Sequence, residues 1–147
     1  MKCHPRVISY LQRAINHEFS ATQQYTLQAV QADLLGLSKF AAELRLGVQE
    51  EIRHAEEFIG RMMRLGATPH GGQPYSPPIG RSYAEMLRFG LATEAEAIRL
   101  HREAAHFCEH SGDAENHALF VRIHDDEVHH YHDLERALQA LGDRSTA

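Results

Sequence analysis

The chain has 147 residues, a hydrophobic content of 43% and a net charge of −5 with its histidines neutral, which fits one globular domain over residues 1–147. The acidic balance argues against nucleic-acid binding and mildly favours the attraction of cations. No apolar run is long enough to cross a bilayer, the N-terminus lacks the apolar stretch of a signal peptide, and the two cysteines lie far apart. We therefore expect a cytoplasmic protein with no membrane or nucleic-acid partner.

The first half of the chain predicts two helices. One covers residues 5 to about 34, because a proline such as Pro5 is tolerated in a first helical turn. A short break follows, in which Ser38 can act as an N-cap, and the second helix covers residues 39 to about 65. So short a break makes the two helices antiparallel neighbours.

The second half repeats this arrangement after a longer connection. A linker rich in proline and glycine covers residues 66–81, a third helix begins near Ser82 and ends by Gly112, and Asp113 can cap a fourth that ends at about Leu141. The extended linker reaches roughly 50 Å, whereas a helix of about 28 residues is roughly 42 Å long. The linker can therefore run the length of the molecule. The sequence predicts an all-α four-helix bundle with one long crossover between helices two and three.

Two Glu-x-x-His pairs and two further glutamates form one pattern along the four helices. The spacing from the lone Glu18 to Glu51 of the first pair equals the spacing from the lone Glu94 to Glu127 of the second pair. One pair alone is weak evidence, since a third pair occurs at Glu103 and His106. The set consists of Glu18, Glu51, His54, Glu94, Glu127 and His130.

Helical phase separates this set from the third pair. Each of the four glutamates falls where the apolar stripe of its helix calls for a core residue, whereas Glu103 lies nine residues after Glu94, on the opposite face. A single glutamate in core phase is usually an edge residue that extends to solvent, but four in phase are hard to obtain by accident. Unpaired buried carboxylates are costly, and no core lysine or arginine is evident to neutralise them. The sequence therefore predicts a centre with two divalent metal ions.

Each predicted metal ion has one imidazole and several carboxylates. A histidine one helical turn after its glutamate reaches the same ion. By analogy with known di-metal bundles, Glu18 and Glu94 are terminal ligands, and Glu51 and Glu127 bridge the two ions. Oxygen-rich sites with one nitrogen suit iron or manganese better than zinc.

Three other residues have two interpretations each. His101 and His124 lie in core phase near the centre and could support the metal ligands from behind or be extra ligands, but we expect buried histidines with satisfied hydrogen bonds. Cys108 is expected to be a small core residue rather than a redox thiol.

Beyond the metal ligands, short segments spread over nearly the whole chain resemble the bacterioferritin family. They are Val7–Leu11, Gln24–Tyr25, His54–Ala55, Ile79–Gly80, Glu85–Arg88 and Arg102–Ala104. The resemblance implies a ferritin-like bundle that oxidises Fe(II) at a centre of two iron ions per subunit and deposits ferric mineral in a homo-oligomeric shell. It also implies that Tyr25 is a redox-active tyrosine; the alternative is a packed core aromatic.

Three positions depart from the family pattern. The family's haem-ligating methionine is replaced by Ile52, which cannot ligate iron, so we expect no haem to be held at this position. A histidine of the family's inner-surface iron site is replaced by Leu46, although Glu50 keeps a carboxylate beside it. The family's short fifth helix would follow Ala147, and we expect this chain to lack it, which leaves shells of 12 or 24 subunits as alternatives.

We therefore expect a ferroxidase that stores and detoxifies iron, with either O2 or H2O2 as oxidant. The alternative is a non-storing oxidase or peroxidase with two iron or manganese ions. A DNA-protecting mini-ferritin is disfavoured, because the chain is acidic and such proteins usually place their metals between subunits.

Overall fold

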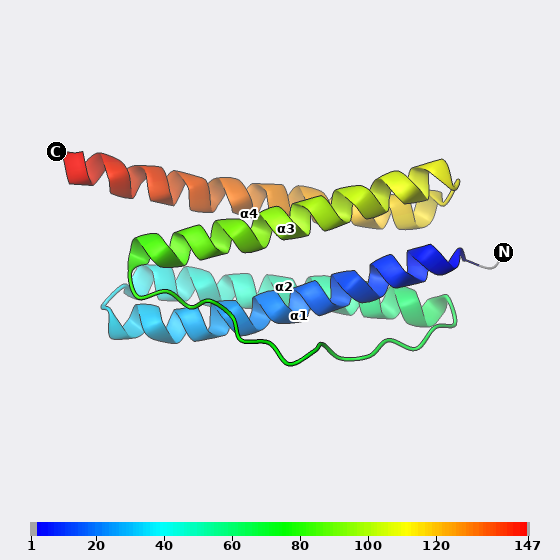
Figure 1. Cartoon of the computed structure of the whole chain (residues 1–147), viewed down its shortest axis with the longest axis horizontal. Helices are drawn as coiled ribbons and strands as arrows, with labels where there is room; N and C mark the ends of the chain where they lie inside the picture. Colours follow the sequence, from blue (N-terminus) through cyan, green and yellow to red (C-terminus); the bar gives the residue numbers. More distant parts are fainter. Residues whose placement is uncertain (1–2, 147) are drawn as a thin grey trace.

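In the computed structural model, which describes residues 3–146, the chain forms four long helices (Figure 1). The predicted all-α four-helix bundle with one long crossover is confirmed. The ends of the predicted domain, residues 1, 2 and 147, lie outside the described part. The helices are α1 (Pro5–Leu34), α2 (Ser38–Arg64), α3 (Tyr83–His110) and α4 (Ala114–Thr146).

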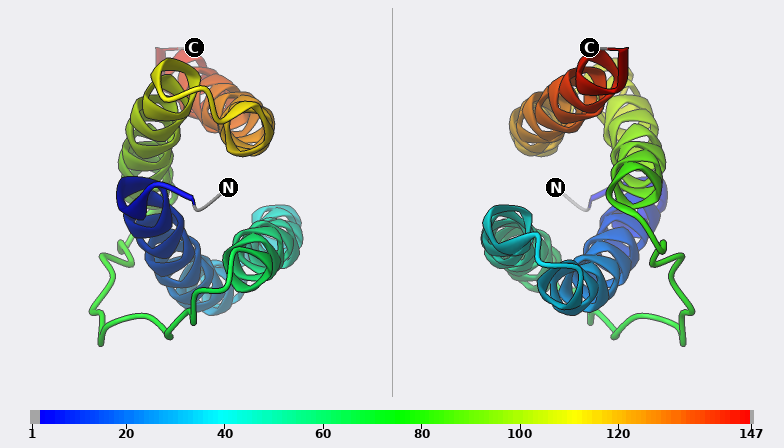
Figure 2. Two further views of the ribbon diagram at one scale, coloured as in Figure 1. Left: turned by 90° about the vertical axis from the view of Figure 1, so that its right-hand side faces the viewer. Right: turned by 90° about the vertical axis from the view of Figure 1, so that its left-hand side faces the viewer.

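The helices pair as two antiparallel hairpins, α1 with α2 and α3 with α4. Residues 65–82 connect the hairpins by running along the bundle, so that α3 points the same way as α2 (Figure 1). Seen from the ends, α1 lies beside α3 (Figure 2). The crossover is fastened to α1, since Gln12 and His70 exchange two hydrogen bonds of 3.0 Å and Gln28 donates to the carbonyl of Ile79 at 3.0 Å.

The connection between α1 and α2 differs from the expectation at Ser38. Gly36 adopts a left-handed conformation (φ 76°), and the N–H of Leu37 donates to the carbonyl of Ala32 at 2.8 Å. This pair of features ends α1 in the manner of a Schellman motif. Leu37 then serves as the cap residue of α2, with no side-chain cap, and Ser38 is already helical. Ser38 is therefore not the N-cap, because the C-terminal motif of α1 leaves no separate capping residue.

The other two helix starts are capped by side chains. Ser82 Oγ accepts a hydrogen bond from the N–H of Glu85 at 3.2 Å, and Asp113 Oδ1 accepts one from the N–H of Asn116 at 3.1 Å. The predicted end of the fourth helix was wrong, because α4 continues through Gly142 to Thr146. A glycine costs about 1 kcal/mol in a helix interior, which neighbouring good helix formers can offset.

The hydrophobic core consists of two clusters at either end of the bundle. One is built around Phe58 and Phe120 and includes the fully buried Cys108, and the other is built around Phe40 and Leu87. Between them lies a belt of buried polar side chains from all four helices. Within residues 3–146, no helix is long and apolar enough to cross a membrane.

One buried cation was not anticipated from the sequence. Arg61 is only 8% exposed, where we expected no core arginine. Its guanidinium donates to Asn116 Oδ1 at 2.7 Å and pairs with Glu115. Because Arg61 is already paired at the N-terminal end of α4, it does not neutralise the central glutamates.

Candidate metal centre

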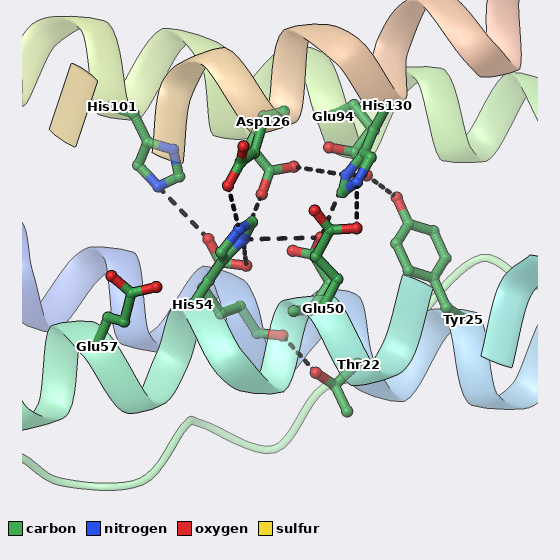
Figure 3. Close-up of polar contacts among 12 residues, drawn as sticks. Thr22, Tyr25, Glu50, His54, Glu57, Glu94, His101, Asp126 and His130 are labelled. Carbon is green, nitrogen blue, oxygen red and sulfur yellow. Dashed lines mark hydrogen bonds and ion pairs between the residues drawn. The ribbon is translucent and has the colours of Figure 1, made fainter. Parts of the chain in front are cut away.

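The structure brings the six predicted ligands together in the polar belt. Every helix supplies one of the glutamates, and α2 and α4 each add a histidine one turn later. The four carboxylates are 0–3% exposed, His54 is 3% exposed and the His130 side chain is 18% exposed. Figure 3 shows His54, Glu94 and His130 pointing inward between the two hairpins.

Donor atoms from these residues fall into two overlapping groups. We call Glu18, Glu51, His54 and Glu127 the Glu18 half, and Glu51, Glu94, Glu127 and His130 the Glu94 half. Within each half, one donor atom of every residue lies within 4.8 Å of one from each of the others. Each half therefore has the size and composition to surround one ion with three carboxylates and one imidazole.

Glu51 and Glu127 belong to both halves. Glu127 Oε1 lies 2.9 Å from Nδ1 of His54, and its other oxygen lies 3.6 Å from Nδ1 of His130. Glu51 Oε1 lies 4.0 Å from Nδ1 of His54 and 3.5 Å from Nδ1 of His130. A carboxylate that faces two imidazoles in this way has the position that a bridging ligand requires.

Two further carboxylates orient the histidines. Nε2 of His54 is 3.0 Å from Asp126 Oδ2, and Nε2 of His130 is 2.7 Å from Glu50 Oε2 (Figure 3). An Nε2–H that donates to a carboxylate leaves Nδ1 as the electron-pair donor, and carboxylates of this kind raise the basicity of metal-binding imidazoles. Both histidines therefore direct a fixed Nδ1 toward the centre.

Several buried donor atoms lack a hydrogen-bond partner. Both oxygens of Glu18 and one oxygen each of Glu51 and Glu94 are buried without one. The oxygens of Glu127 are buried as well, and their near neighbours are Nδ1 of His54 at 2.9 Å and Nδ1 of His130 at 3.6 Å. Buried polar atoms are nearly always hydrogen-bonded, and each exception calls for an explanation. Converging unpaired oxygens and one imidazole per half are the donor set that iron or manganese prefers, so the residues present fit two such ions.

Protons balance the carboxylates in the absence of metal. Burial, followed by the charge of Glu51, raises the pKa of Glu18 well above its ordinary value. Burial and the charge of Glu127 do the same to the pKa of Glu94. Burial would also raise the pKa of Glu127, but contacts with Glu94, His130 and His54 outweigh it and hold that pKa well below the ordinary value. Glu127 thus carries a negative charge while Glu18 and Glu94 tend to hold protons.

The histidines carry the matching positive charge. Burial alone would lower the pKa of His54, but the Glu127 and Glu51 carboxylates raise it to about 9. For His130 the same competition, with Glu127 and Glu51 as partners, raises the pKa to about 12. Cation binding must displace these protons, because a metal needs the neutral imidazole.

Tyr25 lies against the Glu94 half. Its hydroxyl donates to Glu94 Oε1 at 2.6 Å, and the ring is 4% exposed. Burial and the charge of Glu94 raise the pKa of this phenol well above its ordinary value, so the phenol stays protonated. The hydroxyl therefore directly contacts a predicted ligand, a contact that packing of a core aromatic does not require.

The expectation of satisfied histidines was wrong for His101. This side chain is fully buried, neither ring nitrogen has a hydrogen-bond partner, and Nε2 lies 3.5 Å from Glu18 Oε1. His124 is half-buried and its Nδ1 is 3.1 Å from Asp125 Oδ1. The two histidines therefore differ, and only His101 is unsatisfied beside a predicted ligand.

The third Glu-x-x-His pair forms no part of the centre. Glu103 is exposed and accepts a hydrogen bond of 2.8 Å from the Tyr10 hydroxyl. His106 instead lies near Glu109 and His110, all three of them exposed on α3. Helical phase thus separated the decoy pair correctly from the two buried pairs.

The structure adds Asp126 and the contact of Glu50 to what the sequence indicated. Each acid directly precedes the glutamate of its Glu-x-x-His pair, so both pairs read acid-Glu-x-x-His. This shared acid was a signal available in the sequence. It does not reveal by itself that each acid reaches the histidine of the opposite helix.

Comparison with known proteins agrees with this architecture. A family model described as ferritin-like domain matches residues 8–143. The chain therefore belongs to the ferritin-like family.

Curated relatives and solved structures narrow the assignment. The chain is 33% identical to a bacterioferritin of Rhodobacter capsulatus over 98% of this chain and 89% of that one, and 31% identical to a bacterial ferritin of Synechocystis over 94% and 89%. A solved structure of Rhodobacter capsulatus bacterioferritin, described as having a metal-free dinuclear site and haem iron, superposes with a TM-score of 0.90 over the same 98% and 89%. Mycobacterium tuberculosis bacterioferritin BfrA, 28% identical, superposes with a TM-score of 0.92 over 97% and 90%. Within the ferritin-like family, the chain thus groups with the bacterioferritins.

Proposed function

We propose that this protein stores and detoxifies iron by oxidising Fe(II) to Fe(III) at a centre within each subunit and depositing the product as mineral in a homo-oligomeric shell. In this proposal the protein is a single ferritin-like domain and acts in the cytoplasm. The observation that carries it is the set of buried, unpaired carboxylate oxygens that converge with two imidazoles in a chain similar to bacterioferritins. Iron is the substrate here, and the six ligands hold two Fe(II) ions side by side.

The residues have distinct roles in this reaction. Glu18 and Glu94 each serve one ion, His54 and His130 supply one nitrogen each, and Glu51 and Glu127 span both ions, as their positions in both halves support. Holding two ions together matters because each Fe(II) gives up one electron. Two electrons and two protons reduce O2 to H2O2 or H2O2 to two waters, so either oxidant is consumed without releasing a one-electron product.

Tyr25 is a further residue of the proposed site. Its hydroxyl contacts Glu94 and can pass an electron or a proton to the Glu94 half, which the short 2.6 Å contact supports. The alternative, a purely packing role, predicts that Tyr25→Phe leaves the oxidation kinetics unchanged.

Stopped-flow measurement of Fe(II) oxidation tests the central proposal. The wild-type protein should oxidise two Fe(II) per chain in a fast phase, and Glu51→Ala should abolish that phase because it removes a ligand from both halves. Glu103→Ala is a matched control, since this glutamate is exposed and belongs to the decoy pair. A fast phase that survives Glu51→Ala would contradict the assignment.

Storage requires a closed shell in addition to oxidation. Size-exclusion chromatography with light scattering should show a particle of 12 or 24 subunits that retains far more than two iron ions per chain. We propose that such a particle holds no haem through position 52, since Ile52 offers no ligand atom. A haem absorption band in the purified protein that disappears on Ile52→Ala would contradict this part.

A cavity favours a second candidate, the non-storing oxidase or peroxidase. About 860 Å³ of space is lined by Tyr25, Glu94 and His130 at the centre and extends to the α1–α2 connection at residues 36–39. Such a volume admits a small organic substrate. A dimer that oxidises two Fe(II) per chain but retains no mineral would favour this candidate over storage.

A further inference from the structure

The two halves of the chain repeat at a constant offset, the one that separates Glu18 from Glu94. Each member of the second Glu-x-x-His pair follows its counterpart in the first pair at this same offset. The orienting acids obey it as well, since Asp126 follows Glu50 by an equal distance along the chain. The centre is therefore built from two equivalent helical hairpins, and any position near one half has a counterpart near the other.

The counterpart of Tyr25 under this offset is His101. Tyr25 lies on α1 and contacts Glu94 of α3, whereas His101 lies on α3 and approaches Glu18 of α1. Both are seven residues, or two helical turns, after the lone glutamate of their own helix. Figure 3 shows the two side chains on opposite sides of the centre. Tyr25 and His101 thus occupy equivalent positions in the two hairpins but have chemically different side chains.

Among the predicted ligands, Glu18 is the one with a donor atom within 4.0 Å of a ring nitrogen of His101. Its ring packs against Phe58 and Phe120, with centroids 5.5 and 6.2 Å away, so its orientation is fixed by apolar contacts. Burial lowers the pKa of His101 to about 3, which makes the ring a neutral imidazole with one N–H. Nε2 lies 3.5 Å from Glu18 Oε1, while Glu18 Oε2 faces Nδ1 of His54 at 3.8 Å.

We propose that His101 is a positioning residue for Glu18: its Nε2–H donates to Oε1 of the ionised carboxylate and leaves Oε2 free for the cation of the Glu18 half. This inference rests on the proposed function, since it assumes that Glu18 binds a metal ion. It gives the buried Nε2 of His101 a partner, since leaving a buried N–H without one is costly.

A consequence is that the two halves are unequal. An imidazole N–H supports the carboxylate of the Glu18 half, and a phenol supports that of the Glu94 half. Phenol can donate an electron as well as a hydrogen bond, whereas a neutral imidazole donates only the hydrogen bond under the same conditions. His101 therefore strengthens cation binding in the Glu18 half, whereas Tyr25 places a residue that can donate an electron beside the Glu94 half.

The inference is tested in two variants, each of which keeps only one half of the centre intact. Co(II) is the probe, because its binding is visible in the absorption spectrum and the centre does not oxidise it. Glu94→Gln leaves the Glu18 half as the principal binding site, and Glu18→Gln leaves the Glu94 half. We expect His101→Leu to weaken Co(II) binding about 10- to 100-fold in the Glu94→Gln background, the usual effect of removing a partner of a metal ligand. In the Glu18→Gln background the same substitution should change nothing. His101→Gln should restore most of the affinity, since its amide N–H can reach the same oxygen.

Two controls separate a local effect from general destabilisation. His117→Leu removes a partly buried histidine of α4 whose ring contacts the carbonyl of Ala105, and it should leave Co(II) binding unchanged. His110→Ala removes a ligand of the exposed group on α3, and subtracting its signal accounts for Co(II) bound at that surface. Circular dichroism of the metal-free variants establishes that each is folded.

The outcomes distinguish this inference from the proposed function. Failure of the wild-type protein to bind two Co(II) ions in its interior overturns both. Two tightly bound Co(II) ions with no effect of His101→Leu in the Glu94→Gln background overturn the inference alone. An equal loss in both backgrounds also overturns it, because His101 would then act only through packing.

Discussion

Removing the metal should make the stability of this protein depend steeply on pH, and His54 provides the clearest measure. Its folded-state pKa of about 9 lies above the ordinary value of 6.5, so the folded protein holds this proton more tightly than the unfolded chain. The stabilisation is fully present below pH 6.5 and is lost as the pH rises through about 9. The difference between the two pKa values, at about 1.4 kcal/mol for each pH unit, gives about 3 kcal/mol. At roughly 3 °C per kcal/mol for a chain of this size, the melting temperature should fall by about 10 °C.

Thermal unfolding of chelator-treated protein, followed by circular dichroism between pH 6.5 and 9.5, measures this effect. The raised pKa values of His130, Glu18 and Glu94 act in the same direction, so the diagnostic quantity is the difference between the wild-type protein and His54→Gln. His54→Gln should lose about 3 kcal/mol less over this range, whereas His129→Gln, with a side chain 74% exposed, should follow the wild type. With metal bound the imidazole is already deprotonated, so the His54 contribution to the decline should vanish. Parallel pH curves for the wild type and His54→Gln would refute the reasoning.

Two other substitutions test the surroundings of the centre and the crossover. Asp126→Ala should weaken Co(II) binding about 10- to 100-fold because His54 loses its orienting acid, while the neighbouring Asp125→Ala, 71% exposed, should not; equal affinities measured by spectroscopic titration would contradict the role of Asp126. Gly80→Ala should destabilise the protein by about 1–3 kcal/mol in urea unfolding, since Gly80 has φ 91° and a Cβ there would meet the backbone N of Met86 at 3.0 Å. Gly71→Ala, with nothing within 4 Å of its Cβ, is the control, and a similar loss in both variants would argue against strain at residue 80.

Helical periodicity carried most of what could be predicted from the sequence. A period of 3.6 places Glu18, Glu51, Glu94 and Glu127 on the apolar stripes, and the structure buries all four. The crossover followed from comparing linker length with helix length. Both inferences depend on local rules that do not require knowing how side chains pack.

Features that depend on contacts between helices were not predictable in the same way. Arg61 looked like a surface residue, but Asn116 and Glu115 of another helix satisfy its guanidinium and allow it to be buried. Likewise, Asp126 reads as one of several acids on α4 until its distance to His54 of α2 is known. The prediction of where α4 ends was wrong for a different reason, since one glycine lowers the stability of a helix without ending it.

The charge arrangement of the metal-free centre explains how such a cluster survives folding. Four buried carboxylates would repel one another strongly if all were ionised. Raised pKa values at Glu18 and Glu94 favour their neutral forms, and raised pKa values at His54 and His130 favour imidazolium beside Glu127. Without metal, bound protons therefore supply the positive charge that two cations supply in the metal-bound protein. Binding two divalent ions must release those protons. Low pH thus stabilises the metal-free fold and weakens metal binding. Iron uptake by this centre should accordingly strengthen as the pH rises from 6.5, over the range in which the metal-free fold weakens.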